Sequence, residues 1–204
     1  MNNKVDEDKS NAIKIILVGD SGTGKTNLIT VAVGFEFNSN SLTTTSCSYV
    51  QKKIIKDNKE YKINLWDTIG QEKYRSLTKI FLKDSKIVIF VYDITKRETF
   101  ESLQFWKKVI DDVLGFGPIF GVVGNKNDLY FEEKVKEEEG EEFANSIKAK
   151  FVLTSAKNDA KGFNRFIELL LKEYIINKGD FDKDRMESVV IKSIQKKKKG
   201  EGCC

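Results

Sequence analysis

The chain has no histidine among its 204 residues, which excludes imidazole acid–base chemistry and histidine metal ligands. Its three cysteines, Cys47, Cys203 and Cys204, offer no disulfide framework, so we expect a reducing compartment. No apolar run approaches the roughly 20 residues of a membrane-spanning helix, and residues 1–10 are too polar for a secretory signal. Asn2 stands where N-myristoylation requires glycine, so any membrane attachment must be added chemically elsewhere.

The positive charge is unevenly distributed. The formal net charge is only +4, and the four consecutive lysines Lys196–Lys199 account for an equal amount, so the remainder of the chain is close to neutral. A nucleic-acid-binding protein would spread its excess charge over the folded body, so we expect no nucleic-acid partner. Hydrophobic residues make up 40% of the chain, enough for the core of one ordinary domain.

Short apolar runs alternate with amphipathic stretches along the chain. Buried strands are predicted at 13–18, 87–92, 119–123 and 151–153, and apolar residues recur at helical spacing over 103–113 and 163–175. Alternating apolar residues on either side of Asp57-Asn58 predict one antiparallel hairpin. The pattern therefore indicates an α/β fold whose sheet is mostly parallel, with one antiparallel edge strand.

A glycine-rich segment, Gly19–Thr26, follows the first predicted strand and matches the phosphate-loop pattern G-x-x-x-x-G-K-[ST]. Glycines let backbone N–H groups converge on phosphates, and the following helix adds the positive end of its dipole. Lys25 is expected to reach the β- and γ-phosphates, and the Thr26 hydroxyl to ligate Mg²⁺. The alternative is a turn that merely joins strand to helix. The expected nucleotide-binding residues here are Ser21, Gly22, Thr23, Gly24, Lys25, Thr26 and Asn27.

Two later motifs select the base. Asn125-Lys126-Asn127-Asp128 follows a predicted strand, and an Asp carboxylate there can accept both N1–H and N2–H of guanine, a pair that adenine lacks. Ser155-Ala156-Lys157 follows the next strand and could donate a backbone N–H to guanine O6. Either motif alone could be an ordinary loop, but together with the phosphate loop they favour GTP or GDP as the ligand.

These motifs, together with Trp66–Glu72, resemble those of Ras-superfamily GTPases in order and spacing over residues 11–178. Trp66-Asp67-Thr68, Gln71-Glu72 and the terminal Cys203-Cys204 resemble the Rab family in particular. The resemblance implies the small-GTPase form of the P-loop NTPase fold, with a six-stranded sheet and helices on both faces. It also implies a switch that hydrolyses GTP slowly without a GTPase-activating protein (GAP) and regulates vesicle-mediated transport.

The resemblance also assigns roles to individual residues. Asp67 would hold Mg²⁺ through a water, the Gly70 N–H would bond the γ-phosphate, and Gln71 would orient the attacking water. Thr44, which is 18 residues after Thr26 and 23 before Asp67, would contact Mg²⁺ and the γ-phosphate; its neighbours Thr43 and Thr45 remain alternatives. Phe37 stands where the family places an aromatic ring against guanine.

The sequence also departs from the Rab pattern. Thr45–Tyr49 replaces the usual Ile-Gly-Val-Asp-Phe of the surface that faces effectors, so partner identity cannot be transferred. Ile69 replaces an alanine beside Gly70 and could slow hydrolysis. One alternative is therefore a GTP-binding scaffold with little hydrolysis. A second is another P-loop enzyme, such as a nucleotide kinase or an ATPase, which Asn125 and Asp128 disfavour.

The last residues resemble the double-cysteine ending of Rab substrates for geranylgeranyl transfer. Two lipids on Cys203 and Cys204 would anchor the chain stably, and Lys196–Lys199 would add attraction to an anionic leaflet. The alternative is a solvated basic tail. We expect a disordered start (1–10), a GTPase domain (11–178) and a flexible tail (179–204). The expected protein is a monomer on the cytoplasmic face of intracellular membranes with a cytosolic pool, served by an exchange factor, a GAP, effectors and a lipid-masking carrier.

Overall fold

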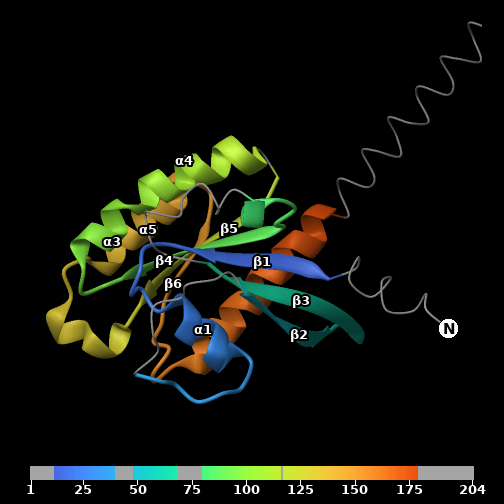
Figure 1. Cartoon of the computed structure of the whole chain (residues 1–204), viewed down its shortest axis with the longest axis horizontal. Helices are drawn as coiled ribbons and strands as arrows, with labels where there is room; N and C mark the ends of the chain where they lie inside the picture. The colour runs from blue at the N-terminus through green and yellow to red at the C-terminus, as the bar shows by residue number, and fades with distance from the viewer. Residues whose placement is uncertain (1–11, 40–47, 69–79, 116, 179–204) are drawn as a thin grey trace, which may run out of the picture.

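A six-stranded sheet with the strand order β2-β3-β1-β4-β5-β6 forms the centre of the molecule (Figure 1). The computed structural model describes residues 12–39, 48–68, 80–115 and 117–178. The strands are β1 (Ile13–Val18), β2 (Ser48–Lys56), β3 (Lys59–Asp67), β4 (Ile87–Asp93), β5 (Ile119–Asn125) and β6 (Lys150–Leu153). Only β2 and β3 pair antiparallel, which confirms the predicted sheet with one antiparallel edge strand.

Helices cover both faces of this sheet. The helix α1 and the last described helix (residues 160–178) lie on one face, and α3, α4 and α5 lie on the other (Figure 1). Their bounds are α1 (Lys25–Ala32), α3 (Arg97–Glu101), α4 (Leu103–Leu114) and α5 (Glu137–Ser146), with a 3₁₀ helix η2 (Asn127–Glu132). Within the described ranges, no helix combines the length and the apolar character needed to cross a bilayer.

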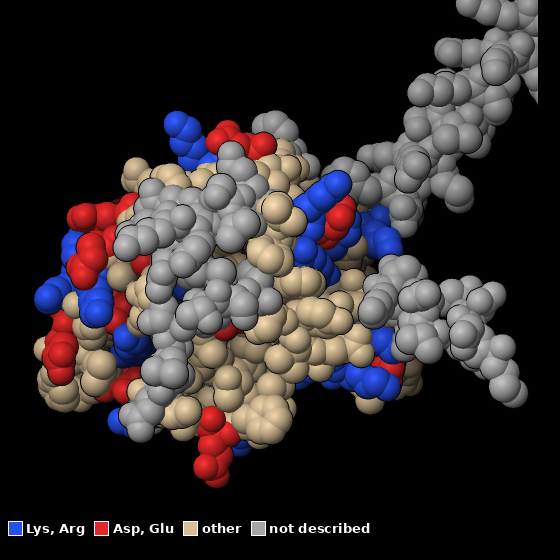
Figure 2. Space-filling model, viewed as in Figure 1, with Lys and Arg blue, Asp and Glu red and all other residues tan. Residues whose placement is uncertain are grey.

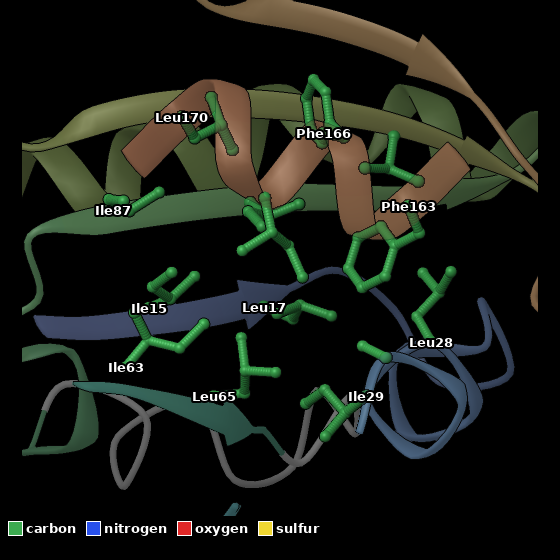
Figure 3. Close-up of a cluster of buried hydrophobic side chains, with 14 of the residues drawn as sticks. Ile15, Leu17, Leu28, Ile29, Ile63, Leu65, Ile87, Phe163, Phe166 and Leu170 are labelled. Carbon is green, nitrogen blue, oxygen red and sulfur yellow. The ribbon is translucent and has the colours of Figure 1, made fainter. Parts of the chain in front are cut away.

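The central strand β1 divides its side chains between two cores. Ile15 and Leu17 point into the core shared with α1 and the 160–178 helix, which is drawn in Figure 3. Ile16 and Val18 point into the core on the opposite face, beside α4 and α5. All four are fully buried, because successive residues of a strand face opposite sides. The end of β1 is therefore packed on both faces, through Leu17 and Val18, at the point where the phosphate loop begins.

The hairpin between β2 and β3 turns at Asp57 and Asn58. Both residues have positive φ, 50° and 56°, in the left-handed region that tight two-residue hairpin turns require. Asp and Asn adopt this region more readily than other non-glycine residues. The turn sets the register that pairs Ser48 with Asp67. Because β3 also pairs parallel with β1, Asp67 ends β3 at the same edge of the sheet where β1 ends.

Ion pairs cover the surface of α3 and α5. Basic and acidic side chains are intermixed on the left side of Figure 2, where Figure 1 places these helices. Nη1 of Arg97 on α3 lies 2.5 Å from Oε2 of Glu139 on α5. Both residues, with Phe100 and Phe143, line a groove of about 390 Å³. None of the residues lining this groove belongs to the predicted nucleotide site.

Candidate functional site

The predicted site segments meet at the carboxyl ends of the parallel strands. The loop 19–24 leaves β1, Asp67 ends β3, Asn125 ends β5, and residues 154–157 follow β6. Parallel strands end at a common edge, and ligands of open α/β sheets bind there. The structure thus brings together segments that are up to about 130 residues apart in the sequence.

The phosphate loop depends on a close approach at Gly24. This residue has φ 91° and ψ 20°, in the left-handed region, and it directly precedes the first turn of α1. A Cβ at this position would overlap the side-chain amide of Asn125. Glycine is therefore required twice over, for the backbone conformation and for the contact with the second motif.

Lys25 is the first residue of α1, and its side chain folds back over the loop. Its Nζ donates to the carbonyl oxygen of Gly19 at 2.9 Å and to that of Asp20 at 2.8 Å. Burial lowers the pKa of Lys25 to about 8, although the carboxylates of Asp67 and Asp20 oppose this shift. The ammonium is held by two neutral carbonyls, which a phosphate could replace with charged oxygens.

Thr26 and Asp67 supply two oxygen groups at one point of the site. The Thr26 hydroxyl, in the first turn of α1, donates to Oδ2 of Asp67 at the end of β3, at a distance of 2.7 Å. Hydroxyl and carboxylate oxygens suit Mg²⁺, which takes one or two carboxylates and completes its shell with phosphates and water. Within the described ranges, no three acidic, histidine or cysteine side chains lie together as a metal-binding group.

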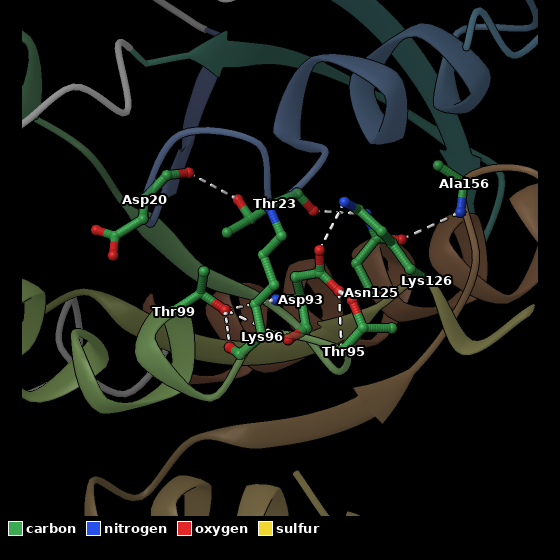
Figure 4. A network of polar contacts seen from close by, with 9 residues as sticks. All are labelled: Asp20, Thr23, Asp93, Thr95, Lys96, Thr99, Asn125, Lys126 and Ala156. Atoms are coloured by element: carbon green, nitrogen blue, oxygen red, sulfur yellow. Dashed lines mark hydrogen bonds and ion pairs between the residues drawn. The ribbon is translucent and has the colours of Figure 1, made fainter. Parts of the chain in front are cut away.

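Asn125 joins the two halves of the site. Its side-chain amide donates to the Thr23 carbonyl at 2.7 Å, and its Oδ1 accepts the Ala156 backbone N–H at 3.2 Å. The residue is buried, with 1% of its surface exposed. These contacts tie the phosphate loop to the segment after β6 (Figure 4), and the contact of Asn125 with the nucleotide stays a prediction.

Lys126 is anchored by a residue that the sequence analysis missed. It adopts φ 69°, and its Nζ lies 2.6 Å from Asp93 Oδ2 at the end of β4. Asp93 is fully buried, and its Oδ1 accepts both the N–H and the hydroxyl of Thr95 (Figure 4). The sequence did carry one signal for Asp93, namely that an acidic residue ends an otherwise apolar strand at the edge where ligands bind.

Asp128 and Ser155 lie together, as the two base-selecting motifs require. The Ser155 hydroxyl donates to Asp128 Oδ1 at 2.5 Å and accepts the backbone N–H groups of Lys157 and Asn158, each at 3.1 Å. This arrangement fixes one carboxylate oxygen while keeping the segment after β6 compact. Asp128 is about half-buried, and Lys157 is exposed.

Phe37 and Asn27 lie at the margin of the described site. Asn27 on α1 donates its side-chain amide to the carbonyl of Asn38 at 3.1 Å, which holds the segment after α1 against the helix. Phe37 is 37% exposed in that segment. Several predicted residues lie outside the described ranges, namely Thr44, Gly70, Gln71, Cys203 and Cys204, and Ile69 lies outside them as well.

Comparison with known proteins gives a consistent family assignment. The model of the Ras family matches residues 14–175. The Ras-related protein YPTC6 of Chlamydomonas reinhardtii is 33% identical over 216 residues, covering the whole of both chains. The Ras-related protein Rab11D of Lotus japonicus is 35% identical over 85% of this chain and 79% of its own. Human Ras-related protein Rab-22A is 38% identical over 77% of this chain and 81% of its own.

Proposed function

Because the chain belongs to the Ras family as a Rab-type small GTPase, which binds guanine nucleotide and hydrolyses GTP, we propose specific roles for its site residues. The observation that carries the proposal is the convergence of Lys25, Thr26, Asp67 and Asp128 at one edge of the sheet. Residues 11–178 form the GTPase domain in this proposal.

The phosphates lie in the loop 21–26, against the first turn of α1. Backbone N–H groups of the loop and the helix dipole attract negative charge there. Lys25 exchanges its contacts with Gly19 and Asp20 for oxygens of the β- and γ-phosphates. The Thr26 hydroxyl would hold Mg²⁺ directly and Asp67 would hold it through a water, and the metal would neutralise negative charge on the phosphates.

The guanine base lies between Lys126 and the segment 155–157. Asp128 accepts from N1–H and N2–H of guanine, while Ser155 keeps the carboxylate oriented, which its present contact at 2.5 Å supports. Asn125 acts by joining the loops that bind the phosphates and the base. Phe37 flanks the base from the segment after α1.

Hydrolysis depends on residues outside the described ranges. Gln71 orients the attacking water, and Thr44 and the Gly70 N–H hold the γ-phosphate until cleavage releases the two segments that carry them. A GAP supplies the missing positive charge at the transition state. Tyr49, which stacks on Trp66 with ring centroids 4.8 Å apart, belongs to the surface that effectors contact.

We further propose that the chain acts in vesicle-mediated transport at the cytoplasmic face of intracellular membranes. Geranylgeranyl groups on Cys203 and Cys204 anchor it, and a carrier masks them in the GDP state. An exchange factor reloads the monomeric protein with GTP. The alternative function is a GTP-binding scaffold that barely hydrolyses, which Ile69 favours because its bulky side chain adjoins Gly70.

Competition for a fluorescent GDP analogue tests the nucleotide assignment. The purified chain should release the analogue to unlabelled GTP or GDP but retain it in a hundredfold excess of ATP. Lys25→Ala should bind the analogue at least about 100-fold more weakly, since a charged hydrogen-bond donor to phosphate is lost. Displacement by ATP as effective as by GTP would support a different P-loop enzyme instead.

A further inference from the structure

Asp20 places a negative charge inside the loop that binds negative phosphates. A carboxylate facing the phosphates would repel them in a site of low effective dielectric. The phosphate-loop pattern requires no particular residue at this position, so the sequence gives no reason for an acidic one. The structure supplies a contact that accounts for it.

The carboxylate of Asp20 is directed out of the loop, toward the helix α4. Its Oδ1 accepts the indole N–H of Trp106 at 2.9 Å, between residues that are 86 positions apart. Trp106 is 1% exposed and packs in the core beside β4. Figure 4 shows the carboxylate pointing away from Thr23, whose hydroxyl faces the carbonyl of Asp20.

The backbone of Asp20 points the other way, into the loop. Its carbonyl oxygen accepts the Thr23 hydroxyl at 3.0 Å and Lys25 Nζ at 2.8 Å. Asp20 therefore links α4, through its side chain, to two residues of the phosphate loop, through its carbonyl. A buried tryptophan is a fixed donor, because its ring cannot rotate without displacing the surrounding core.

We propose that Asp20 and Trp106 are positioning residues, which hold the phosphate loop in its nucleotide-binding conformation from α4. The tether fixes the Asp20 carbonyl and with it the resting position of Lys25. It also turns the carboxylate away from the phosphates, so that its charge is directed at an indole N–H. Loss of either partner loosens the loop and speeds nucleotide release. This inference rests on the proposed role of residues 19–26 as the phosphate loop.

Nucleotide release from four variants tests the tether. Asp20→Ala and Trp106→Phe should each release a fluorescent GDP analogue about tenfold faster than wild type, the scale of one hydrogen bond to a charged group. Their double variant should be no faster than either single one, because both lose the same contact. Asp20→Asn keeps an oxygen acceptor for the indole and should stay within about twofold of wild type.

Two matched controls separate this role from general destabilisation. Lys107→Ala and Asp111→Ala each remove one partner of a surface ion pair on α4, outside the phosphate loop. Both should release the analogue at the wild-type rate. Since Trp106→Phe could also loosen the core, thermal unfolding of all variants without nucleotide is measured alongside.

The outcomes are distinct. Rates for Asp20→Ala and Trp106→Phe equal to wild type, or multiplying in the double variant, would overturn the tether. Asp20→Asn as fast as Asp20→Ala would also overturn it, because charge and not the hydrogen bond would then matter. Lys25→Ala serves as the reference: undiminished GDP binding by that variant would contradict the phosphate-loop assignment itself. Loss of binding in Lys25→Ala with unaltered release from the tether variants would overturn this inference alone.

Discussion

The hydroxyl of Thr26 donates to Asp67 Oδ2 at 2.7 Å, although the two residues lie 41 positions apart. Thr26 lies in the first turn of α1, and Asp67 ends β3. The contact follows from the parallel pairing of β1 and β3, which brings both carboxyl ends to one edge. The hydroxyl proposed to ligate Mg²⁺ and the carboxylate proposed to hold it through a water therefore lie at one point of the site.

Thr26→Ala should raise the Mg²⁺ concentration needed to slow GDP release by at least about tenfold, since one oxygen ligand is lost. Release of a fluorescent GDP analogue measured against a Mg²⁺ titration gives this value. Thr30→Ala is the control, because the Thr30 hydroxyl lies one turn further along α1 and donates to the Thr26 carbonyl. Equal Mg²⁺ dependence of Thr26→Ala and wild type would rule out the metal role.

Lys25 predicts a pH dependence of both stability and binding. Burial lowers the pKa of Lys25 to about 8 from an ordinary 10.5. The unfolded chain therefore binds more protons between these values, and the free energy of unfolding should rise with pH across that window. Bound phosphates would favour the protonated form of Lys25, so above pH 8 the protein must take up a proton to bind GDP. GDP affinity should therefore fall by up to about tenfold per pH unit above 8.

Calorimetry of GDP binding in buffers of different ionisation enthalpy measures the number of protons that the protein takes up on binding. Proton uptake on GDP binding should be near zero at pH 7 and should approach one proton per GDP by pH 9. Lys25→Arg keeps its charge over this range and serves as the control, which also corrects for titration of the nucleotide. Proton uptake at pH 9 that is the same in Lys25→Arg and wild type would contradict the prediction.

Asp128→Asn should change the preferred base from guanine to xanthine. The new amide N–H₂ opposes N2–H₂ of guanine but matches the oxygen that xanthine carries there. Affinity for GDP should fall by at least about 100-fold, the cost of an unpaired buried polar contact, while XDP should gain. Ser155→Ala removes the hydroxyl that orients Asp128. It should lower the affinity for GDP less than Asp128→Asn does, and it should not raise the affinity for XDP. GDP affinity unchanged in Asp128→Asn would contradict the base assignment.

Asp93→Asn should separate the ion pair with Lys126 from the contacts with Thr95. Asparagine keeps an oxygen for Thr95 but loses the charge that holds Lys126, so we expect a loss of about 1 kcal/mol in unfolding free energy. GDP release should become several-fold faster. Asp93→Ala loses both sets of contacts and should cost about 2–4 kcal/mol. Denaturant unfolding measures the free energy of unfolding of both variants. Equal stability of Asp93→Asn and wild type would show that the ion pair with Lys126 does not stabilise the fold.

Local patterns were sufficient to predict much of the sheet. The run 13–18 is apolar on both faces because β1 is central, and its predicted bounds match the strand. Asp57-Asn58 between alternating residues predicted the hairpin, and its backbone has the required positive φ. In contrast, α5 carries five glutamates in ten residues and few apolar ones, so its periodicity gave no helix prediction.

Contacts between distant segments could not be predicted in the same way. The motif around Asn125 predicted a nucleotide contact, but the partners of its side chain, Thr23 and Ala156, depend on how three loops meet. Asp93 and Trp106 carried no motif, because their importance comes from Lys126 and Asp20 lying beside them in space. Sequence spacing identifies which segments face a ligand, whereas the contacts that hold those segments require the fold.

Turnover of GTP and ATP by the purified full-length chain with Mg²⁺, with Gln71→Leu measured alongside, tests the central claim most directly. The account predicts slow hydrolysis of GTP, no hydrolysis of ATP, and a further decrease of at least about tenfold in Gln71→Leu, because the attacking water loses its orienting group. Hydrolysis of ATP at a rate comparable to that of GTP, or turnover of GTP unaffected by Gln71→Leu, would contradict it.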